Sequence, residues 1–245
     1  YMERSNTKEL DIAEKPITLF DIDNTLVSGF TIFPFADFLA TKGLMQASTL
    51  RIMHDDLTKY ERKQNSYYDF AVDVVNHYAE GLNGVPQKDI VLAGYEYFEI
   101  YLTKLLPYAE KLVSQMNMHG VTIAVSGAPQ EAFLPMARHL EMSHVYLLQV
   151  EYENGVCSGK VNMALDEEKL KVVNSLTLLG FSKDQSFSFG DSTGDLPILE
   201  AVTNPFTVNP NDELRKIALE RNWPVVTVQT IIELVRKRLA VLKID

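Results

Sequence analysis

Two aspartates, Asp21 and Asp23, directly follow the apolar run Ile17–Phe20 in the stretch ITLFDIDNTL. Side chains two residues apart on an extended chain point to the same side, so these carboxylates would lie next to each other. Like charges this close raise the pKa of one group unless a cation or a shared proton compensates them. Asp and Asn are also common in solvated turns. The stretch alone therefore indicates either a cation-dependent site or a turn after a buried strand.

Two further polar stretches follow apolar runs later in the chain. They are SGA, residues 126–128, after VTIAV, and GDSTGD, residues 190–195, after QSFSF. Either one alone is typical of a turn, but ligands of open parallel sheets bind beyond the carboxyl ends of the strands. We therefore expect one crevice to receive four carboxylates, those of Asp21, Asp23, Asp191 and Asp195. Such a set requires a divalent cation, and all-oxygen ligands favour Mg²⁺.

The elements that would position these residues alternate between strand and helix from residue 107 onward. Nearly continuous apolar strands in such an alternation predict an α/β protein with a Rossmann-like three-layer α/β/α core and a mainly parallel sheet. Asn154-Gly155 predicts a hairpin turn, and Gly120 is expected to end a helix in a left-handed conformation. Residues 31–106 carry aromatic-rich helical patterns and no convincing strand. We expect an inserted all-helical cap between core segments 1–30 and 107–245.

Composition excludes several classes of partner. The chain has 245 residues, 46% of them hydrophobic, and a net charge of -10, so we expect no nucleic acid and no anionic membrane as partner. A single cysteine, Cys157, leaves no internal disulfide and no cysteine-based zinc site, which favours a reducing, cytoplasmic location. The first fifteen residues are polar and charged, and no apolar stretch approaches the ~18 residues of a membrane span. The sequence predicts no particular oligomeric state.

A seat for an anion is also predicted. Ser126 and the backbone N–H groups of Gly127 and Ala128 precede the helical pattern PQEAFLPMARHL, and a helix N-terminus favours a phosphate oxygen. The stretch DEEKLK offers Lys169 and Lys171 as balancing cations, although isolated lysines are usually surface residues. Together with the expected metal site, these features predict a phosphorylated substrate.

DIDNT, SGA, a lysine and GDSTGD, in this order, resemble the haloacid dehalogenase superfamily, and specifically its phosphoserine-phosphatase-like branch. The similarity covers roughly residues 15–30 and 107–240, and the helical insertion is similar to the cap of this branch. The resemblance implies that Asp21 is a nucleophile forming an aspartyl-phosphate and that Asp23 is the proton donor and base. It also implies Lys169 as the charge-neutralising lysine, because GKVNMALDEEK is similar to the family run that ends on its lysine.

The remaining roles implied by the resemblance concern metal and phosphate. Mg²⁺ would be held by Asp21, by the backbone carbonyl of Asp23 and by Asp191, with Asp195 orienting these ligands. The phosphate would be bound by Ser126 and Gly127, together with Asn24 and Thr25 of the first motif.

Three functions are compatible with these residues. The leading one is a Mg²⁺-dependent phosphatase for a small phosphorylated metabolite; the others are a phosphotransferase or mutase with the same intermediate and a non-catalytic receiver-like domain. Against the last, a receiver has no long helical insertion. Phosphoserine phosphatases carry an acidic residue soon after the first motif, whereas this chain continues VSGFTIFPF, so the mouth of the site is expected to be apolar. Arg51 and Arg62 are the candidate anion contacts of the cap, and the aromatics Phe30, Phe33 and Phe35 are more typical of a core.

Overall fold

The computed structural model describes residues 10–162 and 165–242; the charged first nine residues of the predicted core lie outside this part. A six-stranded sheet with strand order β3-β2-β1-β6-β7-β8 forms its centre. All neighbouring pairs in this sheet are parallel. The strands are β1 (Ile17–Phe20), β2 (Val121–Pro129), β3 (His144–Leu148), β6 (Phe187–Gly190), β7 (Asn204–Val208) and β8 (Val225–Val226).

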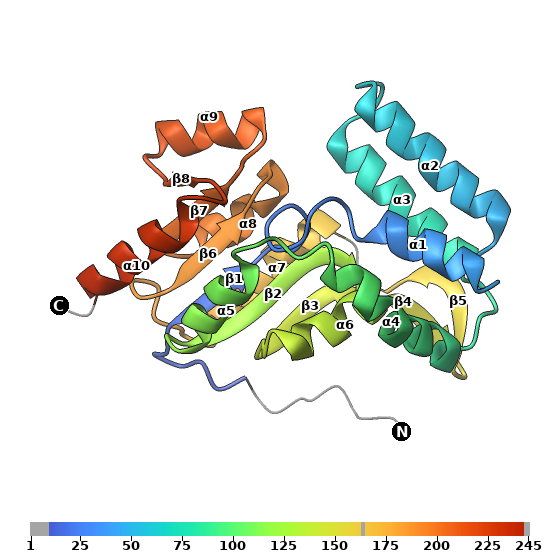
Figure 1. Ribbon diagram of the computed structural model, residues 1–245, viewed down its shortest axis with the longest axis horizontal. Helices are drawn as coiled ribbons and strands as arrows, with labels where there is room; N and C mark the ends of the chain where they lie inside the picture. Colours follow the sequence, from blue (N-terminus) through green and yellow to red (C-terminus); the bar gives the residue numbers. More distant parts are fainter. Residues whose placement is uncertain (1–9, 163–164, 243–245) are drawn as a thin grey trace.

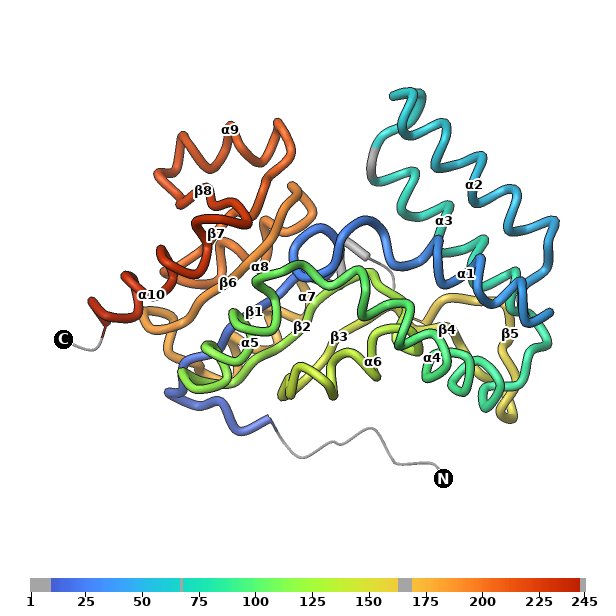
Figure 2. Tube along the Cα trace, in the orientation of Figure 1, coloured from blue at the N-terminus to red at the C-terminus, as the bar shows by residue number. Residues whose placement is uncertain are grey.

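Helices cover both faces of the sheet because successive strand residues point to opposite sides. Phe20 of β1 belongs to one hydrophobic cluster and Leu19 to the other. The first cluster includes residues of α5 (Ala109–Asn117), α6 (Gln130–His139) and α10 (Ile231–Leu242). The second includes residues of α7 (Leu165–Leu178), α8 (Leu196–Glu200) and α9 (Asp212–Glu220). The predicted three-layer α/β/α core is confirmed (Figure 2).

The insertion after β1 is helical throughout. It contains α1 (Ile32–Thr41), α2 (Ala47–Glu61), α3 (Tyr67–Gly81) and α4 (Gln87–Leu102). The antiparallel hairpin of β4 (Val150–Glu153) and β5 (Val156–Val161) turns at Asn154 and Gly155, both with positive φ, as predicted. This hairpin packs against α3, and α4 packs against α6 (Figure 1). We propose a division into a core (1–30 and 107–245) and a cap (31–106). The two parts contact each other extensively through these elements.

Gly120 follows α5, but its φ is not positive, so it does not adopt the expected left-handed conformation. A Cβ atom at Gly120 would instead lie 2.1 Å from the backbone oxygen of Pro16. The expectation for this residue was wrong: the glycine is required by the close approach of two chain segments, not by a helix cap. Val121 N donates to the same Pro16 oxygen at 3.0 Å, which sets the register of β1 beside β2.

None of the helices among the described residues combines the length and the apolar character that crossing a membrane demands.

Candidate active site

The three polar stretches meet where the sheet topology predicts. β1 lies between β2 and β6, so that the chain runs outward to one side from β1 to β3 and to the other side from β6 to β8. The carboxyl ends of strands beside such a switch point form a crevice. Asp21 directly follows β1, Asp191 directly follows β6, and Ser126 lies near the end of β2.

Lys169 is the cation at the centre of this crevice. Its Nζ atom donates to Asp21 Oδ1 at 2.8 Å and to Asp195 Oδ1 at 2.5 Å, and all three side chains are less than a tenth exposed. Lys171, two residues further along α7, is exposed instead. Helical geometry decides between the two lysines, since positions two apart on a helix face different directions.

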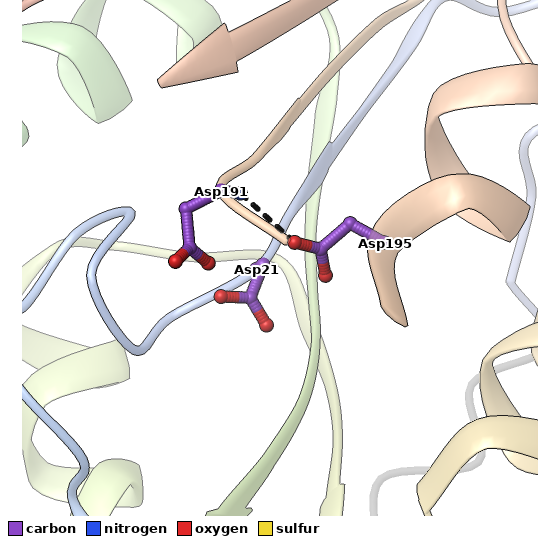
Figure 3. A group of neighbouring side chains, drawn as sticks. All are labelled: Asp21, Asp191 and Asp195. Atoms are coloured by element: carbon purple, nitrogen blue, oxygen red, sulfur yellow. Dashed lines mark hydrogen bonds between the residues drawn. The ribbon is translucent and has the colours of Figure 1, made fainter. Parts of the chain in front are cut away.

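Asp195 is fully occupied by hydrogen bonds. Its Oδ2 atom accepts from the backbone N–H groups of Asp191 at 2.9 Å and Ser192 at 3.0 Å, while Oδ1 accepts from Lys169. Ser192 and Asp195 form a reciprocal capping box at the short helix Thr193–Asp195. Gly190 is required at this place, because a Cβ atom there would lie 2.5 Å from the Asp195 Cβ. Asp195 therefore fixes the loop that presents Asp191 (Figure 3).

Charge in the crevice is unbalanced. Burial, followed by the charge of Asp195, raises the pKa of Asp21 to about 7, and burial with the charges of Asp195 and Asp21 raises the pKa of Asp191 to about 9. Burial would lower the pKa of Lys169, but Asp195 and Asp21 hold it well above its usual value.

This imbalance matches a divalent cation. One oxygen each of Asp21, Asp191 and Asp195 lies within 4.8 Å of the others. Three carboxylates and one ammonium leave a surplus of two negative charges, and carboxylate oxygens are the ligands that Mg²⁺ prefers. The residues fit Mg²⁺ with Asp21 and Asp191 as side-chain ligands, because the oxygens of Asp195 are already engaged.

Asp23 lies apart from this group and is held by Thr31. The backbone N–H of Thr31 donates to Asp23 Oδ1 at 3.0 Å, and the Thr31 hydroxyl donates to the same oxygen. The Thr31 hydroxyl and the Tyr101 hydroxyl are 2.6 Å apart. Burial raises the pKa of Asp23 to about 6, while the hydrogen bonds from Thr31 oppose this rise. The two aspartates of DIDNT thus have different partners and different environments.

The predicted phosphate contacts divide into two groups. Ser126, Gly127 and Asn24 line the cavity at the strand ends, and Asn24 adopts a left-handed conformation in which its Oδ1 atom accepts from Gly29 N at 3.0 Å. Thr25 is not among the lining residues: it is fully buried, and its carbonyl accepts from the Tyr108 hydroxyl at 2.5 Å. The turn after Asp23 directs Thr25 into the protein, so the structure does not bring it to the other predicted phosphate contacts.

A cavity of about 930 Å³ extends from the acidic residues to the insertion. Phe30 and Phe33 line it, whereas Phe35 is fully buried in the core. Arg51 and Arg62, the candidate anion contacts, are exposed and are not among its lining residues.

Sequence reasoning missed Thr31, Tyr101 and a set of polar residues at the outer end of the cavity: Lys63, Asn65, Asp212 and Glu213. The motif pattern contains no signal for any of them. Thr31 directly precedes α1, eight residues after Asp23, whereas the others come from α4, from the α2–α3 turn and from α9.

The comparison with known proteins identifies the family. A family model described as haloacid dehalogenase-like hydrolase matches residues 18–200. The chain belongs to the haloacid dehalogenase-like hydrolases. The resemblance drawn from DIDNT, SGA and GDSTGD is therefore confirmed. The matched region includes the insertion, over which the resemblance drawn from the sequence is weak.

Relatives and solved structures of this hydrolase agree with the fold. It is 26% identical over 223 residues to a histidinol-phosphatase of Neisseria meningitidis serogroup C, covering 86% of this chain and 98% of that protein. It is 23% identical over 218 residues to the phosphoserine phosphatase SerB1 of Mycobacterium tuberculosis, covering 84% and 68%. A Bordetella pertussis protein of unknown function superposes with a TM-score of 0.71 at 23% identity, covering 88% of this chain and all of that one. A phosphoserine phosphatase captured as a phospho-aspartyl intermediate analogue gives 0.63 at 14% identity, covering 90% and 99%.

Proposed function

We propose that this hydrolase removes phosphate from a small phosphorylated metabolite in a Mg²⁺-dependent reaction through an aspartyl-phosphate on Asp21. The observation that carries the proposal is the group formed by the buried residues Asp21, Lys169 and Asp195 and the partly exposed Asp191 at the ends of β1 and β6. Family membership and the phosphatase names of the relatives support phosphoric monoester hydrolysis as the reaction class.

In the first step, an oxygen of Asp21 attacks phosphorus and the bond from phosphorus to the leaving oxygen breaks. Lys169 lies 2.8 Å from Asp21 Oδ1 and balances charge on the nucleophile and the phosphoryl group. Ser126 and the N–H of Gly127 hold a phosphate oxygen at the cavity wall. Asp23, whose pKa of about 6 keeps a protonated fraction near neutral pH, gives its proton to the leaving alkoxide.

In the second step, water attacks the phosphorus of the aspartyl-phosphate. Asp23, now a carboxylate, takes a proton from this water, and the bond between Asp21 and phosphorus breaks to release phosphate. Thr31 keeps the Asp23 carboxylate in one orientation through both steps. Asp21, Asp191 and the backbone carbonyl of Asp23 would hold Mg²⁺. When bound, the ion would supply positive charge for the phosphate oxygens.

The two aspartates can be separated experimentally. With an acyl or aryl phosphate, whose leaving group needs little protonation, Asp23→Asn should form the phosphoenzyme but hydrolyse it about 10²–10⁴-fold more slowly, since general base catalysis is lost. Asp21→Asn should form none, because a neutral amide is a poor nucleophile. Intact-protein mass spectrometry after acid quench measures the adduct. A phosphate adduct on the Asp21 variant would instead make Asp23 the nucleophile.

Metal dependence is tested on the same substrates. Turnover should stop with a chelator and return with Mg²⁺, while Ca²⁺ should inhibit because it accepts more ligands at longer distances. Full turnover with Ca²⁺, or with chelator present, would contradict the proposed site. The names of the relatives make histidinol phosphate and phosphoserine the first metabolites to examine.

A further inference from the structure

The outer part of the cavity has a continuous aromatic wall. Four aromatic residues line the cavity: Phe30, Phe33 and Phe70 contact one another, and Tyr60 contacts Phe70. Tyr60 stacks on Phe70 with ring centroids 4.4 Å apart, and Phe70 in turn stacks on Phe33. These rings come from the entrance of the insertion, the end of α2 and the start of α3. Phe33 and Phe70 are buried, so a leaving group bound here contacts this wall mainly through the partly exposed rings of Phe30 and Tyr60.

Acidic side chains line the cavity beside this aromatic wall. Asp212 and Glu213, both exposed in the first turn of α9, line the same cavity from the core side. Glu213 and Tyr60 line the same cavity, and the charge of Glu213 adds to burial in raising the pKa of the Tyr60 hydroxyl. In Figure 1, α9 and the α2–α3 pair stand on either side of the loop that follows β1. The acids and the aromatic wall therefore face a common space.

An additional acceptor lies at the end of the wall. Asn65, in the turn between α2 and α3, lines the cavity, and its Oδ1 atom is shielded from solvent without a hydrogen-bond partner among the described residues. A buried acceptor without a donor is costly, so such an atom is normally satisfied by a ligand or water. Asn65, Asp212 and Glu213 thus all offer acceptors.

We propose, on the basis of the phosphatase function above, that the substrate is the phosphate monoester of an alcohol that carries both an aromatic or similarly flat apolar body and a cationic amine. The body packs against the partly exposed rings of Phe30 and Tyr60, which both contact the buried ring of Phe70. The amine lies between the Tyr60 face and Glu213, where a cation is attracted by both the ring and the carboxylate.

The main competing interpretation is that the cavity binds a small zwitterion through Lys63 and Glu213. Lys63 also lines the outer cavity and could bind a carboxylate, so that a small zwitterion such as phosphoserine would pair with Lys63 and Glu213. The volume of about 930 Å³ and the aromatic wall favour the larger apolar body, because a small zwitterion would leave this surface in contact with water.

Matched phosphate esters test the proposal with the full chain and Mg²⁺. Phenylalaninol phosphate has both ring and amine, phenylpropyl phosphate lacks the amine, and ethanolamine phosphate lacks the ring. We expect kcat/KM for phenylalaninol phosphate to exceed that of each comparison compound by roughly tenfold. Equal values for the esters with and without the amine, or a preference for phosphoserine, would overturn the substrate class while leaving the phosphatase function intact. Absence of turnover for every ester, including para-nitrophenyl phosphate, would overturn both.

Glu213→Gln tests the cation contact. It should reduce the ratio of kcat/KM between phenylalaninol phosphate and phenylpropyl phosphate to near unity, a ratio that general damage to the site does not change. Glu220→Gln, at the exposed far end of the same helix and outside the cavity lining, is the matched control and should keep the ratio of the unaltered protein. A retained ratio in Glu213→Gln would contradict this placement of the amine.

Discussion

Asp21 and Asp23 are chemically identical and two positions apart, yet their surroundings differ in kind. Asp21 contacts an ammonium, whereas Asp23 is held by the hydroxyl and N–H of Thr31, which in turn contacts Tyr101. Burial raises the pKa of Asp23 to about 6 against the lowering effect of the Thr31 hydrogen bonds, so the residue can exchange a proton near neutral pH. The division of labour between nucleophile and proton carrier therefore depends on Thr31 as a positioning residue.

Replacing Thr31 with valine tests this dependence. Thr31→Val keeps the size of the side chain but removes its donor to Asp23, so proton delivery to the leaving group should become less efficient. We expect kcat for an alkyl phosphate to fall by about tenfold, while an aryl phosphate, whose leaving group needs little protonation, changes much less. Steady-state kinetics on the two esters gives the comparison. Thr103→Val, an exposed threonine at the end of α4, serves as the control.

At the scale of elements, the insertion is fixed to the core by helix contacts and by paired connections. Leu106 N donates to the Leu26 oxygen at 2.9 Å, and Ser28 N donates to the Lys104 oxygen at 2.9 Å, so the two chain crossings are hydrogen-bonded to each other. Beyond them, α4 approaches α6 closely enough that a Cβ atom at Gly94 would lie 2.0 Å from the Glu131 backbone oxygen. The cap therefore has one tightly packed side, formed by α4.

Two glycine substitutions compare this contact with a softer one. Gly94→Ala should lower the free energy of unfolding by about 1–3 kcal/mol, because backbone cannot move aside and overpacking outweighs the gain in helix propensity. Gly81→Ala, also in a helix, faces the Met45 sulfur at 2.2 Å, and this flexible side chain can shift. Its loss should be clearly smaller. Urea unfolding of both variants measures the difference, and equal losses would contradict the close α4–α6 contact.

At the scale of the whole molecule, α2 and α3 pack on each other and line part of the cavity, and α3 also packs against β5. Their ends meet, since Gln46 N donates to the Gly81 oxygen at 3.2 Å. A short linker can therefore join Gln46 to Gly81 in place of the segment from Ala47 to Glu80, which also removes the packing of α3 on β5. This excision removes Tyr60, Asn65 and Phe70 from the cavity but none of the acidic residues at the strand ends.

We expect the shortened protein to lose selectivity before it loses chemistry. It should still hydrolyse acyl and aryl phosphates with Mg²⁺, but differences in kcat/KM among alkyl phosphates of different leaving groups should shrink, because the surface that contacts the leaving group is gone. Circular dichroism establishes that the sheet and remaining helices are present. Undiminished selectivity in a folded product would place recognition in the core.

The sequence alone predicted the apolar strands that DIDNT, SGA and GDSTGD follow, the parallel sheet and the grouping of Asp21, Asp191 and Asp195. These follow from local patterns, since an apolar run ending in aspartate and the topology of parallel strands require no knowledge of distant contacts. The choice of Lys169 over Lys171 came from the resemblance to the family. The expected conformation of Gly120 was wrong, because a close approach to Pro16 that no local pattern encodes requires the glycine there. Thr25 is fully buried and is not among the residues that line the cavity.

Tertiary structure decided which groups surround the reacting atoms. The contact between Thr31 and Tyr101 spans seventy residues, and Asn65 and Glu213 reach one cavity from the cap and from α9. Such neighbours depend on how α2, α3 and α4 lie across the sheet, and this arrangement is set by packing of many side chains at once rather than by any short segment. Short sequence motifs thus identify the reacting residues of the site, whereas the cavity that selects a substrate forms only when the chain folds.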